Sequence, residues 1–385
     1  MHVTLVTPAF AHPERADFPG IRRHSGELVK ALLSKGIQVR VVTPEIDGTD
    51  DAFGGNIEII RLPTSYVATG RAGNVAQARI LAFGKRFSRT PGLLEGTEVI
   101  HADIPLLGID TIRKRRPVVA TGFHLEQTRS ALDLLSVPFG NSYGSYTFRH
   151  ADAVVALSEA AALQLGRRFG ISWEKVHVIH PGIDRSKFYA SGSRNGRGPN
   201  SRTRRILFVG PMSRRKNVIL LLQAYEVLAQ SHVDVQLVLV GSGPLDKKID
   251  RMIRLHSLEG RVLRMRNLDD SKLREAYENA DVYASPSLDE GFGFSVVEAM
   301  ACRTPVVVLD RPVSREVVAD AGILVPDSSI QSWVVALKRL VEDTALADDL
   351  SQRGWTRVRN MYSWDEAADK YARLYERLAG DDLTS

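Results

Sequence analysis

Residues Asp281–Leu309, DVYASPSLDEGFGFSVVEAMACRTPVVVL, decide the fold. The segments at the two ends, DVYASP and PVVVL, are typical of short buried strands, and SVVEAMA between them predicts the start of a helix with Ser295 as its N-cap. A strand, a loop, a helix and a second strand in this order form a β-α-β unit. Such units build parallel sheets that are covered by helices on both faces, so the stretch predicts the α/β class.

The same alternation runs through the whole chain of 385 residues, which is long enough for two domains. Strands are predicted in the first half at VTLVTP, VRVVTP, IEIIRL, EVIHAD, VVATGFH and DAVVALS, and in the second half at RILFVG, VQLVLVG, RVLRM, DVYASP, PVVVL and GILVP. The segments VTLVTP, GELVKALLSKG and VRVVTP form another β-α-β unit, with Gly36 where its helix would stop. Residues 191–204 are rich in Gly, Ser, Asn and Arg and predict a flexible linker, after which the alternation begins again. We therefore expect two Rossmann-like doubly wound domains, at 1–190 and 205–362, that face a central cleft and bind ligands where their strands end.

The composition excludes several classes of protein. Hydrophobic residues make up 44% of the chain and charged residues 25%, as in soluble globular proteins. The single cysteine, Cys302, excludes an internal disulfide and a cysteine-based zinc cluster. No signal peptide pattern or membrane-spanning run is present, so a cytoplasmic location is expected. The net charge of +6 is compatible with an anionic ligand or surface, but the basic residues are not interleaved with aromatic ones as nucleic-acid binding would favour.

Two loops that follow strands of the second domain carry candidate phosphate ligands. In PMSRRKN, Arg214, Arg215 and Lys216 precede the start of a helix, where free N–H groups and cations together favour an anion. A solvated basic loop explains these charges equally well. In VGSGP, Gly241 and Gly243 favour a glycine turn, because a dinucleotide fingerprint would need a third glycine where this chain has an aspartate.

The loop EGFGF lies between two glutamates, Glu290 and Glu298, which are eight residues apart. Their carboxylates could be surface groups, a general acid/base pair, metal ligands or acceptors for the hydroxyls of a ligand. Gly291 and Gly293 allow a backbone that presents N–H groups to a phosphate at the helix start. Carboxylates repel phosphate but accept hydrogen bonds from polyols, so the pattern favours a sugar and a ribose on either side of a diphosphate.

At this point the sequence resembles a known family. The E-x7-E block resembles the signature of the retaining glycosyltransferases of family 4, which have the GT-B fold of two facing Rossmann-like domains. The resemblance covers nearly the whole chain, because FVGPMSRRKN, VLVGSGP, ADVYASPS, AGILVP, VIHPGID and ADAVVALSE occur in the family's order. The final segment at 363–385 resembles the family's last helix, which crosses back to the N-terminal domain.

The resemblance also implies roles for individual residues. Glu298 would accept hydrogen bonds from the nucleotide ribose, and Glu290 would hold hydroxyls of the donor sugar. Lys216, with Arg215, would neutralise the departing diphosphate. His124, in the segment GFH, would face the sugar, and Gly20 would approach the donor phosphates or the acceptor. The donor would further contact the backbone N–H groups of Gly291, Phe292, Gly293, Phe294 and Ser295. The catalytic set is thus His124, Glu290 and Lys216.

The implied reaction transfers a sugar with retention of its anomeric configuration from a nucleotide-diphosphate sugar, of the UDP or GDP type. The acceptor is a carbohydrate, a lipid or a small molecule. A front-face mechanism needs stabilisation of the leaving group more than a nucleophile, and the family implies no metal and no other cofactor. The alternatives are a sugar phosphorylase or a nucleotide-sugar epimerase on the same fold, or a non-catalytic nucleotide-sugar binder.

This chain departs from the family at three places. Pro211 stands where many relatives have an arginine. Relatives often have two glycines where this chain has Pro19 and Gly20, and Arg303 stands where glycine is common.

The segment Ala78–Arg89 mixes apolar and basic residues. It predicts either a surface helix, which is the commoner case, or a peripheral contact with an anionic membrane at the inner face.

Overall fold

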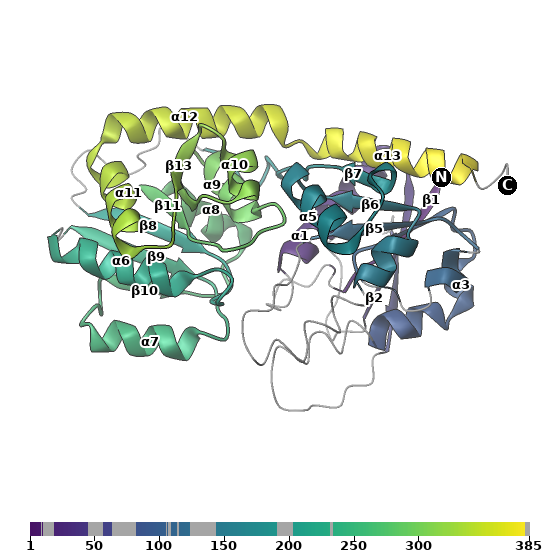
Figure 1. Cartoon of the computed structure of the whole chain (residues 1–385), viewed down its shortest axis with the longest axis horizontal. Helices are drawn as coiled ribbons and strands as arrows, with labels where there is room; N and C mark the ends of the chain where they lie inside the picture. The colour runs from purple at the N-terminus through teal and green to yellow at the C-terminus, as the bar shows by residue number, and fades with distance from the viewer. Residues whose placement is uncertain are drawn as a thin grey trace. The chain divides into compact units, whose positions relative to one another are not determined.

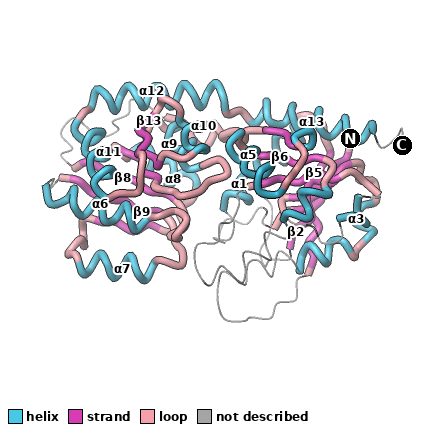
Figure 2. The backbone as a smooth tube through the Cα atoms, viewed as in Figure 1, coloured by secondary structure: helices cyan, strands magenta, loops and turns pink. Residues whose placement is uncertain are grey.

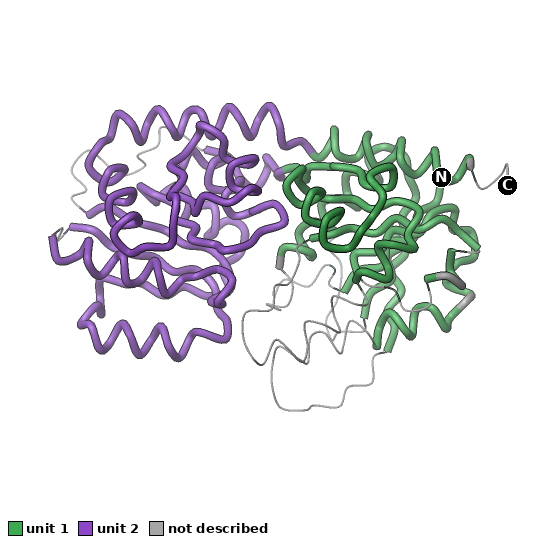
Figure 3. Tube along the Cα trace, in the orientation of Figure 1, with its two compact units in different colours: residues 1–182, 364–385 green, residues 183–363 purple. Residues whose placement is uncertain are grey.

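The computed structural model divides into two compact units, which Figure 3 shows in different colours. Unit 1 contains residues 1–182 and 364–385, and unit 2 contains residues 183–363. The structure describes residues 1–8, 10, 19–44, 57–63, 82–104, 106, 109–113, 115–123, 144–190, 203–231 and 234–381. The predicted linker at 191–204 therefore lies outside the described residues, except for its last two.

Unit 1 is built on a parallel sheet whose described strands follow the order β3-β2-β1-β4-β5-β6-β7. The strands are β1 (His2–Val6), β2 (Gln38–Pro44), β3 (Glu58–Leu62), β4 (Val99–Ala102), β5 (Val118–Gly122), β6 (Ala153–Ala156) and β7 (Val176–Val178). All neighbouring strands are parallel, and β1 lies beside both β2 and β4. The sequence pattern predicted the first six strands. It missed β7, whose three residues are too few for a periodic signal.

The last helix of the chain packs against the first helix, within unit 1. The helices of unit 1 whose bounds are described are α1 (Pro19–Ser34), α3 (Ile109–Arg113), α5 (Glu159–Phe169) and α13 (Trp364–Asp381), with 3-10 turns η2 (Pro91–Leu94) and η3 (Trp173–Lys175). Residues 82–88 and 144–150 are helical as well. The buried apolar side chains of α13 share one core with those of α1 and β1. Figure 1 shows α13 at the C-terminal end of the chain, in yellow. The predicted return of this helix to the N-terminal domain is therefore confirmed.

Unit 2 is a second parallel sheet, in the order β10-β9-β8-β11-β12-β13. Its strands are β8 (Arg204–Val209), β9 (Val235–Val240), β10 (Val262–Met265), β11 (Val282–Ser285), β12 (Val306–Leu309) and β13 (Gly322–Val325). Its helices are α6 (Val218–Ser231), α7 (Asp246–Leu255), α8 (Asp270–Glu278), α9 (Phe294–Ala301), α10 (Pro312–Val318), α11 (Ile330–Glu342) and α12 (Thr344–Met361). The alternation of helices and strands predicted from the sequence is visible in Figure 2. All residues of β11 and β12 are buried, because helices cover both faces of the sheet.

Both sheets contain a point at which the strand order reverses. In unit 1 this point lies between β1 and β4, and in unit 2 it lies between β8 and β11. In doubly wound sheets the loops that leave such neighbouring strands diverge to opposite faces, and ligands bind in the crevice between them. A ligand site is therefore expected at the loops that follow these four strands.

Candidate functional site

The loop after β8 is held in place by the loop after β9. A Cβ atom at Gly241 would lie 2.3 Å from the carbonyl oxygen of Gly210, and one at Gly243 would lie 2.7 Å from the backbone nitrogen of Met212. The N–H of Met212 donates to the carbonyl of Ser242 at 3.0 Å. The two glycines are thus needed for close packing of the loops, which agrees with their interpretation as a glycine turn.

The loops after β8 and β11 bring three charged side chains together at the reversal point of unit 2. The Lys216 ammonium and the Arg215 guanidinium both pair with the Glu290 carboxylate, and the Arg215–Glu290 distance is 3.0 Å. Arg215 also donates to the carbonyl of Asp289 at 2.7 Å, and its own carbonyl accepts from the N–H of Leu288 at 2.9 Å. The backbone of one loop is therefore fixed to the other, and the three charges form one rigid cluster.

The cluster combines burial with a formal excess of one positive charge. Burial lowers the pKa of Lys216, as does the neighbouring Arg215, while Glu290 acts in the opposite direction. Burial alone would raise the pKa of Glu290, but the charges of Lys216 and Arg215 outweigh it and lower that pKa to about 2. Lys216 is only 7% exposed, so its charge is weakly screened by water. A site of this kind attracts an anion more strongly than a solvated basic loop does.

The start of α9 differs from the expectation in one respect. The N-cap is Gly293, with a φ of 93°, and it provides no side-chain cap; the helix begins at Phe294. The predicted N-cap, Ser295, lies inside the first turn instead, where its hydroxyl accepts from the Tyr283 hydroxyl at 2.8 Å. A left-handed backbone at this position favours glycine, which places the cap two residues earlier.

Aromatic contacts hold the loop that precedes α9. Phe292 is 2% exposed and packs its ring against Phe294, with a centroid distance of 5.3 Å, and against Tyr362, at 5.1 Å. The buried ring anchors the backbone of Gly291 and Gly293 on either side of it.

The two glutamates of the predicted motif lie in different environments. Glu290 is held by two cations. Glu298, on α9, is buried and accepts a hydrogen bond from the Tyr277 hydroxyl at 2.8 Å. The structure thus brings Arg215, Lys216 and Glu290 into direct contact, with Glu298 on the adjoining helix. Glu290 and Glu298 therefore do not form a symmetrical acid/base pair.

The two site residues predicted in the first domain, Gly20 and His124, belong to unit 1. Gly20 lies in the first turn of α1. His124 lies outside the described residues, but its neighbour Phe123 is described and packs edge-on against the buried ring of His24, with a centroid distance of 4.9 Å.

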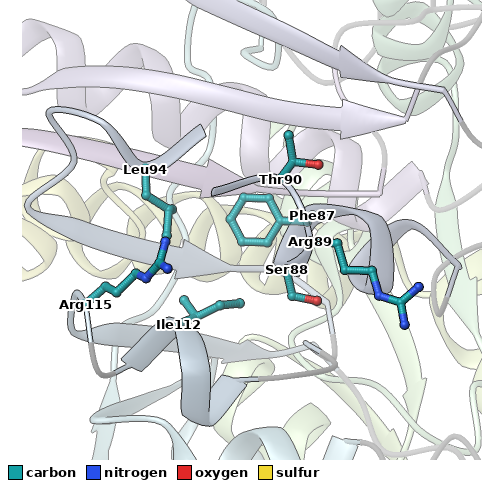
Figure 4. Close-up of a pocket in the computed structure, with 7 residues that line it drawn as sticks. All are labelled: Phe87, Ser88, Arg89, Thr90, Leu94, Ile112 and Arg115. Atoms are coloured by element: carbon teal, nitrogen blue, oxygen red, sulfur yellow. The ribbon is translucent and has the colours of Figure 1, made fainter. Parts of the chain in front are cut away.

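A small pocket of about 210 Å³ lies elsewhere in unit 1, at the C-terminal end of the segment 78–89 (Figure 4). Its lining is formed by Phe87, Ser88, Arg89, Thr90, Leu94, Ile112 and Arg115. Residues 82–88 are helical, and Phe83 and Phe87 are buried in the core, whereas Lys85, Arg86 and Arg89 are exposed. Because the aromatic side chains of this helix are already packed, only its basic side remains for a contact; residues 78–81 lie outside the described part. In the described chain no helix is both long and apolar enough to span a bilayer.

Comparisons with known proteins identify the family of this chain. Two family models match: Glycosyltransferase Family 4 over residues 19–187 and Glycosyl transferases group 1 over residues 193–357. The D-inositol 3-phosphate glycosyltransferase of Xylanimonas cellulosilytica is 30% identical over 414 residues, which cover 97% of this chain and 96% of the relative. The phosphatidyl-myo-inositol mannosyltransferase of Mycolicibacterium smegmatis is 29% identical over 389 residues, with 96% and 93% covered. This chain belongs to glycosyltransferase family 4 and is a glycosyltransferase.

Solved structures confirm the GT-B fold. The sucrose-phosphate synthase of Thermosynechococcus elongatus superposes with a TM-score of 0.84 at 22% identity and covers 99% of both chains. Anabaena HepE, solved in complex with UDP and glucose, superposes with a TM-score of 0.74 at 18% identity and covers 97% of this chain and 99% of that one.

Proposed function

We propose that this glycosyltransferase retains the anomeric configuration of a hexose-type sugar, which it moves from a nucleotide-diphosphate sugar to an acceptor hydroxyl. The observation that carries the proposal is the cluster of Lys216, Arg215 and Glu290 at the reversal point of unit 2, beside the start of α9. Two cations at a helix N-terminus suit a diphosphate, and a carboxylate between them suits the hydroxyls of the attached sugar.

In the proposed reaction the bond between the sugar's anomeric carbon and the diphosphate oxygen breaks. The acceptor oxygen bonds to the same face of that carbon, and its proton passes to the departing phosphate oxygen. Lys216 and Arg215 stabilise the charge that develops on the diphosphate, so the reaction needs no metal and no further cofactor. Glu290 orients the sugar, Glu298 the ribose, and the N–H groups of 291–295 the phosphates. His124 and Gly20 keep the roles that the family resemblance implies for them.

The donor is of the UDP or GDP type, and the acceptor is a sugar, a lipid-linked group or a small molecule. The relatives' names include inositol glycosyltransferases and a phosphatidylinositol mannosyltransferase, so inositol phosphate and phosphatidylinositol come first among acceptors to test. We further propose that the enzyme acts in the cytoplasm and contacts the inner membrane face through residues 78–89, since the described part of this segment exposes Lys85, Arg86 and Arg89.

Thermal unfolding in the presence of nucleotides tests the donor site. At a concentration 100 times its Kd, the correct nucleoside diphosphate stabilises the folded protein by about 2.7 kcal/mol. We expect such a shift with one of UDP, GDP and ADP or their sugars, and its loss in the Lys216→Ala variant. If none of the panel shifts the unfolding of the wild type, the proposal is wrong. NMR of the product with the matching donor sugar then reports whether the anomeric configuration is retained.

A further inference from the structure

A buried tyrosine is joined to the glutamate that is proposed to bind the ribose. The hydroxyl of Tyr277, at the end of α8, donates to Oε2 of Glu298 on α9 at 2.8 Å. Tyr277 is 0% exposed and Glu298 is 2% exposed, so the bond is sheltered from water. Neither the sequence pattern nor the family resemblance assigned a role to Tyr277.

The tyrosine is itself held from several sides. Its carbonyl accepts from the Thr304 hydroxyl at 2.7 Å, which connects the end of α8 to the segment after α9. Its ring meets that of Phe188 edge-on, at a centroid distance of 6.1 Å, and lies 5.8 Å from that of Tyr283. The hydroxyl is therefore aimed at Glu298 by a packed core, and Glu298 cannot change rotamer without breaking a buried hydrogen bond.

The bond also has a chemical consequence for Glu298. A buried carboxylate is costly unless its oxygens accept hydrogen bonds, and a hydrogen bond to a charged acceptor is about twice as strong as a neutral one. A carboxylate has about four acceptor positions, so a bond from one phenol is compatible with further bonds from two ligand hydroxyls. Tyr277 can thus hold Glu298 in one orientation while the carboxylate receives a ligand.

We propose that Tyr277 is a positioning residue that acts through Glu298 and sets the preference of the site for a nucleotide with an intact ribose. The inference rests on the proposed function, because it takes Glu298 as the acceptor for the ribose hydroxyls. Tyr277 does not touch the nucleotide in this account; it fixes the direction of the carboxylate that does.

Calorimetric titration with paired nucleotides tests the inference. The probes are UDP, GDP and ADP and their 2′,3′-dideoxy forms, and the wild type identifies the base to use. We expect the wild type to bind the ribose form about 100-fold more tightly than the dideoxy form, since two hydrogen bonds to a charged group are lost. In Tyr277→Phe the ratio should fall to about tenfold, because the ribose form binds more weakly while the dideoxy form binds as before.

The chain offers a matched control in the same unit. Tyr225, on α6, is also 0% exposed, and its hydroxyl donates to the carbonyls of Val235 at 2.8 Å and Arg261 at 3.0 Å. Tyr225→Phe removes buried hydrogen bonds without touching Glu298, so it should lower thermal stability and leave the ratio of affinities at the wild-type value. A merely structural role for Tyr277 would make the two variants behave alike.

A double-mutant cycle adds a second, independent readout. Glu298→Gln should lower the ribose preference, and Tyr277→Phe should have no further effect on it in that background, since both act through one carboxylate. A wild-type ratio in Tyr277→Phe, or additive effects in the cycle, overturns the inference and leaves the proposed function intact. A wild type that binds none of the nucleotides overturns the proposed function, and the inference with it.

Discussion

The sheets of both units reverse their strand order once, but the side chains at the two reversal points differ: they are charged in unit 2 and mostly neutral in unit 1. In unit 2 the point holds the charged cluster of Arg215, Lys216 and Glu290, whose arginine side chain is 32% exposed. In unit 1 it holds a buried polar network that follows β1 and β4. There the Ser25 hydroxyl donates to Asp103 at 2.5 Å and lies 3.0 Å from that of Thr7.

Helix α13 completes the network of unit 1. The His101 ring bonds the Tyr375 hydroxyl and the Thr121 hydroxyl, each at 2.6 Å. Burial lowers the pKa values of His24 and His101 to about 3, and it raises that of Asp103 to about 7 although three hydroxyls bond this carboxyl. The reversal point of unit 2 is thus lined by charged groups, whereas that of unit 1 is lined by groups whose neutral forms are favoured. Among the described residues, the same topology thus carries a charged cluster in one unit and a neutral polar network in the other, and the side chains decide which.

The largest expected effect comes from removing the ammonium of unit 2. Lys216→Ala should lower kcat/KM for transfer about 10³-fold, because stabilisation of the departing charge in a buried site is lost. Steady-state kinetics with the matching donor and acceptor measure the loss. Lys247→Ala on the exposed side of α7 is the control and should retain full activity. A reduction of less than tenfold in Lys216→Ala would show that the cluster does not act on the leaving group.

The second effect concerns the carboxylate of the same cluster. Glu290→Gln should lower the free energy of unfolding by about 3 kcal/mol at pH 7, because it leaves two partly buried cations without their counter-charge. The folded-state pKa of Glu290 is depressed from 4.5 to about 2. Its contribution is therefore present above pH 4.5 and is lost as the pH falls toward 2, which urea unfolding at several pH values can follow. Equal stability of the two proteins at pH 7 would contradict the account.

The corresponding substitution in unit 1 should show the opposite pH dependence. The pKa of Asp103 is raised from 3.8 to about 7, so the folded state binds this proton more tightly than the unfolded state and loses stability as the pH rises between these values. Asp103→Asn removes that penalty. Relative to the wild type, the variant should gain about 2.5 kcal/mol on going from pH 5 to pH 8. A difference that stays constant with pH would mean that Asp103 titrates normally.

The smallest expected effect concerns the hydrogen bond between α13 and the core of unit 1. Tyr375→Phe deletes the hydroxyl that bonds His101 and should cost about 1 kcal/mol of stability at pH 7. Urea unfolding monitored by tryptophan fluorescence measures it, and Trp364 on the same helix lies 5.5 Å from the His24 ring as a local probe. Unchanged stability would indicate that apolar packing alone holds the helix.

The sequence predicted much of the fold and part of the site. Hydrophobic runs located all the described strands except β7, and the strand-end rule pointed to Arg215, Lys216 and Glu290. The N-cap of α9 was misplaced by two residues because a left-handed glycine cap has no polar side chain to signal it. The role of Tyr277 was missed because it lies four residues after Leu273, which is the spacing of ordinary core residues on one face of a helix.

Arg303 shows why a local rule can be overruled. Its φ of 58° explains why glycine is common at this place, since most side chains are strained there. Here the Ser351 hydroxyl donates to its carbonyl at 2.6 Å, and its guanidinium stacks 4.4 Å from the Trp355 ring. These contacts offset the strain, and they come from residues about fifty positions further along the chain.

By itself the sequence determined the α/β class, the two Rossmann-like halves and the charged loops, because periodicity and glycine placement are local properties of the chain. Only the tertiary structure decided which charges meet. Glu290 lies 74 residues from Lys216 along the chain, and their pairing follows from the adjacency of β8 and β11. The same holds for the neutral network of unit 1, where a tyrosine 274 residues away bonds His101. Burial and partner choice set the protonation of these groups, and both are products of packing.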